Sequence, residues 1–241
     1  MKDIVEHLPA DARPGTFSIA AYDPASETFG TAVATGIVAV GATCPYVSAD
    51  AAVLTQSFTR TEHGRDLLDR VADGDPIDEA GEALLAADDH AGYRQVHGVD
   101  SSGTFTFTGD DCVSWCGHRA GEHVTVAGNM LVGERVVDSV FEAFADTDPE
   151  DPLGDRLLAA LNAGDEAGGD KRGEVSAALL VHAPEPSLAH NLRVDRADDP
   201  VGELRALYDH ARSVEAGLEE ATDELVGEDY PEELLRTGIK Y

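Results

Sequence analysis

The chain has 241 residues and a formal net charge of −30 at pH 7. A chain of this length forms one large domain or two small ones, and it needs no disulfide or metal to fold. No apolar run approaches the roughly 20 residues that cross a bilayer, and residues 1–15 lack a secretory signal. Because the sequence contains no basic stripe, nucleic-acid binding is disfavoured as well. We therefore expect a cytoplasmic protein with no membrane and no nucleic-acid partner.

Acidic residues are spread along the whole chain, whereas lysine occurs only at Lys2, Lys171 and Lys240. In dilute buffer such a surface repels itself, while at molar salt the Debye length falls to about 3 Å and the repulsion is screened. The composition is typical of proteins from salt-in halophiles. A protein that binds a cationic partner is the alternative, which the even spread of acid disfavours.

The first half of the chain begins with strand patterns and then turns helical. Residues 17–21 alternate in polarity and end at the Asp23-Pro24 turn, and residues 28–35 follow closely enough to form a hairpin. Further along, the sequence predicts a strand near residues 52–55 and helices over 65–72 and from Pro76, a residue suited to a first helical turn.

The second half continues with strand pairs followed by helix pairs. Parallel strands need a crossover helix between each pair, so this order argues against a doubly wound parallel sheet. We predict an α+β fold, a four-layer αββα sandwich of two antiparallel sheets covered by helices. It comprises an N-terminal extension or propeptide (1–15), the sandwich domain (16–212) and an acidic helical extension (213–241). Predicted strands cover residues 93–99, 104–108, 122–127, 175–181 and 192–194, and predicted helices cover 134–145, 153–163 and the chain from about residue 201.

Gly15-Thr16, at the start of the first strand, is the strongest local candidate for chemistry. If the bond before Thr16 is cut, this residue gains a free α-amine beside its own hydroxyl. A threonine hydroxyl is a weak nucleophile that needs an adjacent base, and a terminal amine with a pKa of about 8 is such a base. Gly15 leaves the peptide able to adopt strained geometry. The pattern indicates a catalytic Thr16, although a Gly-Thr pair also opens many ordinary strands.

The segment at residues 168–173 keeps one lysine in a chain that has nearly lost this residue. A cation near Thr16 lowers the pKa of its amine and can hold a substrate carboxylate. We therefore count Lys171 and Asp170 among the catalytic candidates, with Asp170 orienting Lys171 or Arg172. Arg172 is a substrate-binding candidate. The alternative is a charged turn that leads into the next strand.

Asn129 and Gln56 are amides at the predicted ends of strands. Acyl transfer needs hydrogen-bond donors aimed at the developing oxyanion, each worth roughly 3–4 kcal/mol in the transition state. We assign this catalytic role to Asn129 and consider Gln56 for substrate binding. The alternative for both is that the amide satisfies backbone groups in a turn.

Cys112, Cys116, His118 and His123 offer the ligand types that zinc prefers. Their spacing matches no recognised zinc pattern, and alternate side chains of a strand face opposite sides. The three cysteines of the chain are also too few for a disulfide framework. We therefore expect no metal and no cofactor, with the cysteines acting as small buried residues and His118 as a candidate for contacting substrate.

Four segments in order carry a family resemblance: GTFSIAAYDPASETFGTAVATGIVAVGATCPY, AVLTQSF, FTGDDCVSWCGHRAGEHVTVAGNML and GGDKRGEVSAALLV. From Thr16 to about His210, the chain resembles the domain-of-unknown-function family 1028, whose members are similar in fold to the N-terminal-nucleophile hydrolases. The resemblance implies a nucleophile at Thr16. In many members this threonine directly follows the initiator methionine, whereas fifteen residues precede it here. Either self-cleavage removes them, or translation begins later, or the nucleophile is never freed.

These features lead to two hypotheses from different classes. In the first, the protein is an amide hydrolase in which Thr16 attacks a carbonyl and its own amine accepts the proton. Its substrate is small and bears a carboxylate, as in an N-acyl amino acid or a cyclic amide. In the second, the same fold serves a non-catalytic binding or assembly protein. A zinc hydrolase built on Cys112, Cys116 and His118 is a third alternative. We expect a homo-oligomer with a small-molecule substrate.

Overall fold

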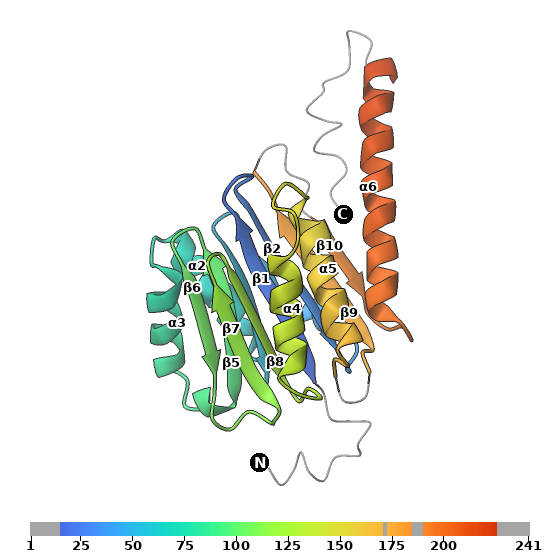
Figure 1. Ribbon diagram of the computed structural model, residues 1–241. Helices are drawn as coiled ribbons and strands as arrows, with labels where there is room; N and C mark the ends of the chain where they lie inside the picture. Colours follow the sequence, from blue (N-terminus) through green and yellow to red (C-terminus); the bar gives the residue numbers. More distant parts are fainter. Residues whose placement is uncertain (1–14, 171–172, 185–189, 226–241) are drawn as a thin grey trace.

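The computed structural model describes residues 15–170, 173–184 and 190–225, which form ten strands and five α-helices (Figure 1). The strands are β1 (Thr16–Asp23), β2 (Thr28–Thr35), β3 (Pro45–Val47), β4 (Ala51–Ser57), β5 (Arg94–Asp100), β6 (Thr104–Thr108), β7 (Cys116–Gly121), β8 (Val124–Asn129), β9 (Ser176–His182) and β10 (His190–Val194). The helices are α2 (Thr61–Ala72), α3 (Ile77–Ala86), α4 (Arg135–Ala145), α5 (Leu153–Glu166) and α6 (Pro200–Leu225).

The strands form two antiparallel sheets. The larger sheet has the order β10-β9-β2-β1-β8-β7, and the smaller one has the order β3-β4-β5-β6. Each pair of neighbours runs antiparallel. Strand β1 therefore lies in the interior of the larger sheet, with β2 on one side and β8 on the other.

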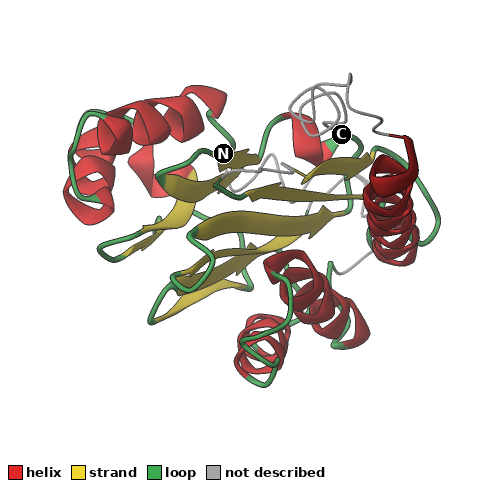
Figure 2. Ribbon diagram, turned by 90° about the horizontal axis from the view of Figure 1, so that it is seen from above, coloured by secondary structure: helices red, strands yellow, loops and turns green. Residues whose placement is uncertain are grey.

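The two sheets pack face to face, and helices cover both outer faces (Figure 2). Helices α4, α5 and α6 pack on the larger sheet, and α2 and α3 pack on the smaller one. The prediction of an α+β sandwich of two antiparallel sheets with covering helices is confirmed.

The alternation of residues along β1 explains why the sheet has two different faces. Phe17 and Ile19 point toward α4 and α5 and belong to the apolar core on that side. Ser18 and Ala20 point the other way, between the sheets. A third apolar cluster fills the space between the smaller sheet and its two helices. The layer between the sheets is apolar around Ala20 and becomes polar toward Thr16.

Several predicted elements match the structure closely, and others differ for physical reasons. The hairpin partner at 28–35 is confirmed as β2. Helix α2 begins at Thr61, before the predicted start at residue 65, because Gly64 is small enough to pack under the ring of Tyr46. Strand β7 was not predicted as a separate strand, since its side chains are mostly half-exposed and alternate weakly.

The structure describes only part of the two predicted terminal extensions. Helix α6 continues through Ser213 to Leu225, so the chain has no break where the acidic extension was placed. Residues 1–14 and 226–241 lie outside the described residues.

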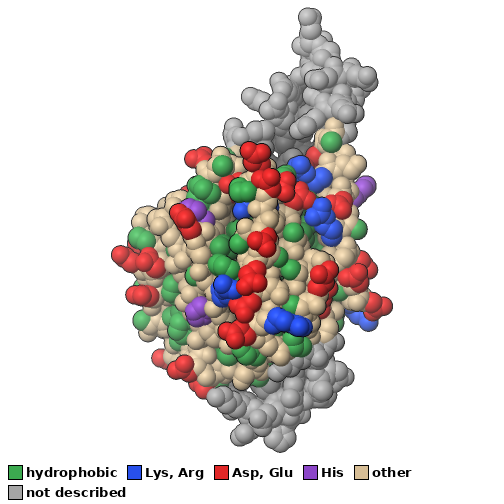
Figure 3. Space-filling view, viewed as in Figure 1, with side chains coloured by type: hydrophobic (Ala, Val, Ile, Leu, Met, Phe, Trp, Pro, Cys, Tyr) green, Lys and Arg blue, Asp and Glu red, His purple; other side chains and the backbone are tan. Residues whose placement is uncertain are grey.

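Acidic side chains are spread over the face shown in Figure 3, with only a few basic ones between them. This agrees with the even distribution of acid along the sequence. Among the helices in the described ranges, none is both long and apolar enough to cross a membrane.

We predict that Leu157→Ala lowers the free energy of unfolding by about 3 kcal/mol, within the usual range for a buried leucine. Leu157 is fully buried on α5, and its Cδ1 occupies the space that a Cβ on Gly30 of β2 would need. Urea unfolding in molar salt measures the loss. The control is Leu207→Ala on α6, because Leu207 is 38% exposed. Equal losses in the two variants would contradict the assigned packing.

Candidate active site

Thr16 lies in a row of residues that crosses the larger sheet. It pairs directly with Thr35 of β2 on one side and Asn129 of β8 on the other. The row continues to Ser176 of β9 and Cys116 of β7. Directly paired residues in an antiparallel sheet point to the same face, so all five side chains face the layer between the sheets. Thr16 itself is 7% exposed.

Gly15, the residue before Thr16, is held by hydrogen bonds to both its carbonyl oxygen and its amide. The carbonyl oxygen of Gly15 accepts from Thr35 Oγ1 at 2.6 Å and from the Gly36 amide at 3.2 Å. The amide of Gly15 donates to Asp170 Oδ2 at 2.7 Å. Two donors on one carbonyl oxygen are the arrangement that stabilises negative charge as a nucleophile attacks the carbon.

The hydroxyl groups of Thr16 and Thr35 have a defined hydrogen-bond direction. Their oxygens are 3.1 Å apart. A hydroxyl carries one proton, and Thr35 donates its proton to Gly15 because a carbonyl oxygen can only accept. Thr16 must therefore donate to Thr35.

Asp170 draws two loops together at this end of the sheet. Its Oδ2 also accepts from the Gly36 amide at 2.9 Å, and that amide shares its one proton between Asp170 and the Gly15 carbonyl oxygen. The amide of Asp170 donates to Glu174 Oε1 at 2.8 Å. The structure thus places Asp170 next to Thr16, where its carboxylate accepts hydrogen bonds from the backbone amides of Gly15 and Gly36. The predicted cations Lys171 and Arg172 lie outside the described residues, so their positions relative to Thr16 stay predictions.

Behind Thr16, the space between the sheets holds a buried network centred on Gln95 of β5. Its Nε2, which carries two hydrogens, lies within hydrogen-bond distance of three acceptors: the carbonyl oxygens of Gly128 at 2.9 Å and Gly117 at 3.1 Å, and Thr108 Oγ1 at 2.9 Å. Its Oε1 accepts from Gln56 Nε2 at 2.8 Å and from Asn129 Nδ2 at 3.0 Å. Since backbone carbonyls accept only, the Gln95 amide has a single possible orientation, and Gln56 and Asn129 must both present their NH₂ groups to it.

Ser18 and His97 form a second pair that resembles a nucleophile with its base, at 2.8 Å. Ser18 donates its proton to Gln56 Oε1 at 2.7 Å, because that oxygen can only accept. His97 Nε2 must then donate to Ser18, and His97 Nδ1 accepts from Thr125 Oγ1 at 2.9 Å. Burial lowers the pKa of His97 to about 3. A neutral His97 that already carries its proton on Nε2 cannot take one from Ser18.

The other predicted site residues lie at different distances from the nucleophile. Asn129 stands directly opposite Thr16. Gln56 is buried behind it and directs its amide to Ser18 and Gln95. His118 is exposed on β7, beyond β8, where its Nδ1 pairs with Thr108 Oγ1 at 2.9 Å.

The side chains that were considered as an alternative zinc site do not converge. Cys112 Sγ donates to the Arg94 carbonyl oxygen, whereas His123 packs against Tyr22 at the far end of β1. In the part of the chain that the structure describes, no three His, Cys, Asp or Glu side chains are grouped as metal ligands.

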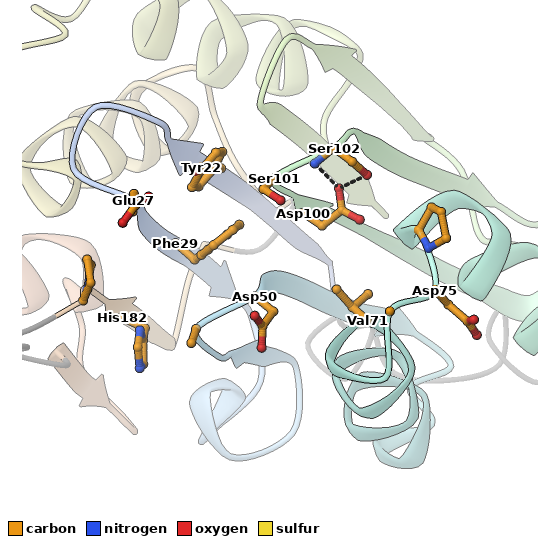
Figure 4. Close-up of a pocket in the computed structure, with 14 residues that line it drawn as sticks. Tyr22, Glu27, Phe29, Asp50, Val71, Asp75, Asp100, Ser101, Ser102 and His182 are labelled. Atoms are coloured by element: carbon orange, nitrogen blue, oxygen red, sulfur yellow. Dashed lines mark hydrogen bonds between the residues drawn. The ribbon is translucent and has the colours of Figure 1, made fainter.

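A separate cavity of about 530 Å³ opens at the opposite end of β1 (Figure 4). Tyr22 lines it, six residues along the strand from Thr16, or about 20 Å at strand rise. The buried acid of the cavity, Asp100, accepts hydrogen bonds from the Ile77 amide at the start of α3 and from the Ser102 amide in the following turn. Asp100 therefore has a structural role, and the cavity is distinct from the site at Thr16.

Sequence reasoning missed Thr35 and Gln95. Thr35 could have been found, because the two hairpin strands are of equal length and their outer ends must meet. Gln95 carries no comparable pattern, since its importance depends on the carbonyls of β7 and β8, which approach only when the sheets pack.

The two antiparallel sheets, their covering helices and the cluster around Thr16 define an α+β sandwich with a threonine at the head of an interior strand. The chain belongs to the family of unknown function DUF1028, whose model matches residues 16–204. Among solved structures, it is similar to protein SPO2555 from Silicibacter pomeroyi, a DUF1028 protein. The identity is 32% and the TM-score 0.76, covering 82% of this chain and 86% of that one. No curated protein matches this chain.

We predict that Glu174→Gln removes a pH dependence of stability. Burial, followed by the hydrogen bond with Asp165, raises the pKa of Glu174 to about 7. A carboxyl whose pKa is raised on folding stabilises the folded state below its unfolded pKa and loses this effect as pH rises through the folded value. The wild-type chain should therefore lose stability between pH 5 and 8, and the variant should lose less.

Urea unfolding in molar salt at both pH values measures this difference. Glu142→Gln is the control, because the Glu142 side chain is 70% exposed. Parallel losses in the wild type and Glu174→Gln would refute the assignment.

Proposed function

We propose that the protein is an amide hydrolase of the N-terminal-nucleophile type, with Thr16 as the nucleophile once the bond between Gly15 and Thr16 is cut. The observation that carries this proposal is the pair of hydrogen bonds from Thr35 and Gly36 to the Gly15 carbonyl oxygen. The Gly36 bond continues the ladder of the β1–β2 hairpin, and the Thr35 hydroxyl adds a second donor to the same oxygen. The same donors suit the oxyanion of an acyl transfer.

The proposed self-cleavage is a balanced chemical step. Thr16 Oγ1 attacks the carbonyl carbon of Gly15, the Gly15–Thr16 C–N bond breaks, and the hydroxyl proton ends on the departing nitrogen. The Thr35 hydroxyl and the Gly36 amide stabilise the oxyanion. Water then hydrolyses the ester, which leaves a carboxylate on Gly15 and a free amine on Thr16.

The freed terminus supplies what amide hydrolysis needs. The α-amine, with an unperturbed pKa of about 8, accepts the hydroxyl proton as Thr16 attacks the substrate carbonyl. It then returns the proton to the leaving nitrogen, and water releases the acyl group. Departure of Gly15 leaves Thr35 and Gly36 to bind the substrate's carbonyl oxygen in its place.

The surroundings of the site favour a substrate with an apolar acyl group. Four large apolar side chains are exposed among the described residues, and three flank the site: Ile37 (43%), Val38 (58%) and Val132 (49%). Ile37 and Val38 follow Gly36, and the Val132 amide donates to the Gly169 carbonyl oxygen, beside Asp170. Lys171 and Arg172 are the proposed partners of a substrate carboxylate. An N-acyl amino acid combines both features.

We predict that Thr35→Val slows self-cleavage by a factor of about 10² to 10³, because one oxyanion donor is lost. Thr35→Ser, which keeps the hydroxyl, should cleave at a rate close to that of the wild type. Thr31→Val is the matched control: Thr31 lies on the same strand and face, and its buried Oγ1 has no hydrogen-bond partner among the described residues. Intact mass and N-terminal sequencing of protein made in molar salt follow the cut.

The wild-type chain should begin at Thr16, and Thr16→Ala should keep its first fifteen residues. A wild-type chain that retains them would refute the proposal. Equal cleavage in Thr35→Val and Thr31→Val would instead remove Thr35 from the mechanism.

We predict that Val132→Ser weakens turnover of long acyl groups selectively. Acyl amides of 5-amino-2-nitrobenzoate, a chromogenic amine with a carboxylate, report hydrolysis directly. The wild type should gain up to about fourfold in kcat/KM for each methylene that becomes buried, and Val132→Ser should lose most of this gain while keeping its rate on the acetyl compound. Leu207→Ser on α6, the fourth exposed apolar side chain, should change neither. A wild type with no chain-length dependence would refute the apolar subsite.

A further inference from the structure

The side-chain oxygen of Asn129 is a buried acceptor that nothing in the described fold satisfies. Asn129 is 1% exposed, and its Oδ1 has no hydrogen-bond partner among the described residues. Leaving a buried polar atom without a partner costs roughly 1–3 kcal/mol. Such an atom next to a nucleophile calls for a functional explanation.

Gln95, in the interior between the sheets, fixes the orientation of the Asn129 amide. Gln95 must turn its Oε1 toward Asn129, because its Nε2 donates to the carbonyl oxygens of Gly117 and Gly128. Asn129 must then turn its Nδ2 toward Gln95. A rotation of the Asn129 amide by 180° would set two oxygens against each other at 3.0 Å. Its Oδ1 is therefore held on the side away from Gln95.

Cleavage of the Gly15–Thr16 bond creates the donors that this acceptor lacks. Before the cut, Thr16 contributes one backbone N–H. After the cut, its nitrogen carries two or three hydrogens, and the residue stands directly opposite Asn129 in the sheet. We infer that Asn129, oriented by Gln95, is the acceptor that positions the freed α-amine of Thr16. This inference rests on the proposed function and assigns Gln95 as a positioning residue.

The consequence is a division of roles across the row. Thr35 and Gly36, on the β2 side, donate to the oxyanion. Asn129, on the β8 side, accepts from the amine, so that the nitrogen lone pair is turned toward Thr16 Oγ1. This replaces the oxyanion role that the sequence suggested for Asn129.

The titratable groups around this amine come from the segment between α5 and β9 and from strands β5 and β7. Asp170 lies beyond Gly15, and Glu174 lies behind Asp170. His97 of β5 is neutral, and it is hydrogen-bonded to Ser18 rather than to Thr16. Cys116 of β7 is the neighbour of Asn129 in the row. None of these groups differs between the wild type and the variants below.

The test is Asn129→Leu, which fills a similar space and removes the acceptor. A hydrogen bond to the charged form raises the pKa of an amine, so its loss should lower the pKa of the Thr16 amine by about 1 unit. The ¹³Cα shift of Thr16 in selectively labelled, cleaved protein measures this pKa without any substrate. The acid limb of kcat/KM on the acetyl amide of 5-amino-2-nitrobenzoate should move to lower pH by the same amount, and kcat should fall at least tenfold because the amine is no longer oriented.

A donor role predicts a different result. If Asn129 donates to the oxyanion, Asn129→Leu loses a factor of 10² to 10³ at every pH, and neither the acid limb nor the amine pKa moves. That outcome, or an unchanged amine pKa, overturns the inference. Thr125→Val is the matched control: Thr125 lies on the same strand and in the same buried network, but contacts His97. It should leave the amine pKa unchanged.

Gln95→Met provides the second test, because it frees the Asn129 amide without altering Asn129. Its kcat should fall at least tenfold with KM nearly unchanged. An unchanged kcat refutes the positioning role of Gln95, also where Asn129→Leu is not cleaved. A wild-type chain that keeps residues 1–15 shows no amine titration at all, and this result refutes the proposed function itself.

Discussion

The two hydrogen bonds from Gln95 to the carbonyl oxygens of Gly117 and Gly128 determine the polar interior of this protein. Carbonyl oxygens only accept, so the Gln95 amide cannot rotate, and its own oxygen dictates the orientation of Gln56 and Asn129. The orientation of Gln56 in turn makes Ser18 a donor to Gln56, and Ser18 must then accept a hydrogen bond from His97. A buried network of this kind holds two sheets in one register, because slipping by one residue would break several bonds at once.

The layer between the sheets thus serves two purposes along its length. At one end, small apolar residues such as Ala20 and Ala52 allow the sheets to pack closely. At the other end, polar side chains surround Thr16, where strands β1, β2 and β8 begin or end and loops meet. Thr16 is held between two different neighbours, a hydroxyl and an amide, and this asymmetry separates the groups that can bind an oxyanion from those that can bind an amine.

Much of the fold could be predicted from sequence, because its information is local. Alternating polarity identified β1, the short distance after the Asp23-Pro24 turn identified β2 as its hairpin partner, and helical periodicity identified α3, α4 and α5. The weakly patterned β7 was missed for the same reason, since its side chains are largely half-exposed and its partners are distant in sequence. The site was predicted unevenly. Thr16 and Asp170 were chosen for their chemistry, and the structure places them together, whereas Gln56 serves the interior and His118 lies beyond β8.

By itself, the sequence determined the acidic surface, the hairpin that begins with Thr16 and the succession of strand and helix pairs, because these depend on composition and on neighbours within a few residues. Only the tertiary structure decided which groups surround Thr16 and in which direction their protons point. Thr35, Asn129 and Asp170 are 19, 113 and 154 residues away from Thr16 in the chain. Their hydrogen bonds form only after β1 is inserted between β2 and β8 and the two sheets close over Gln95, and no local pattern in the sequence encodes that contact.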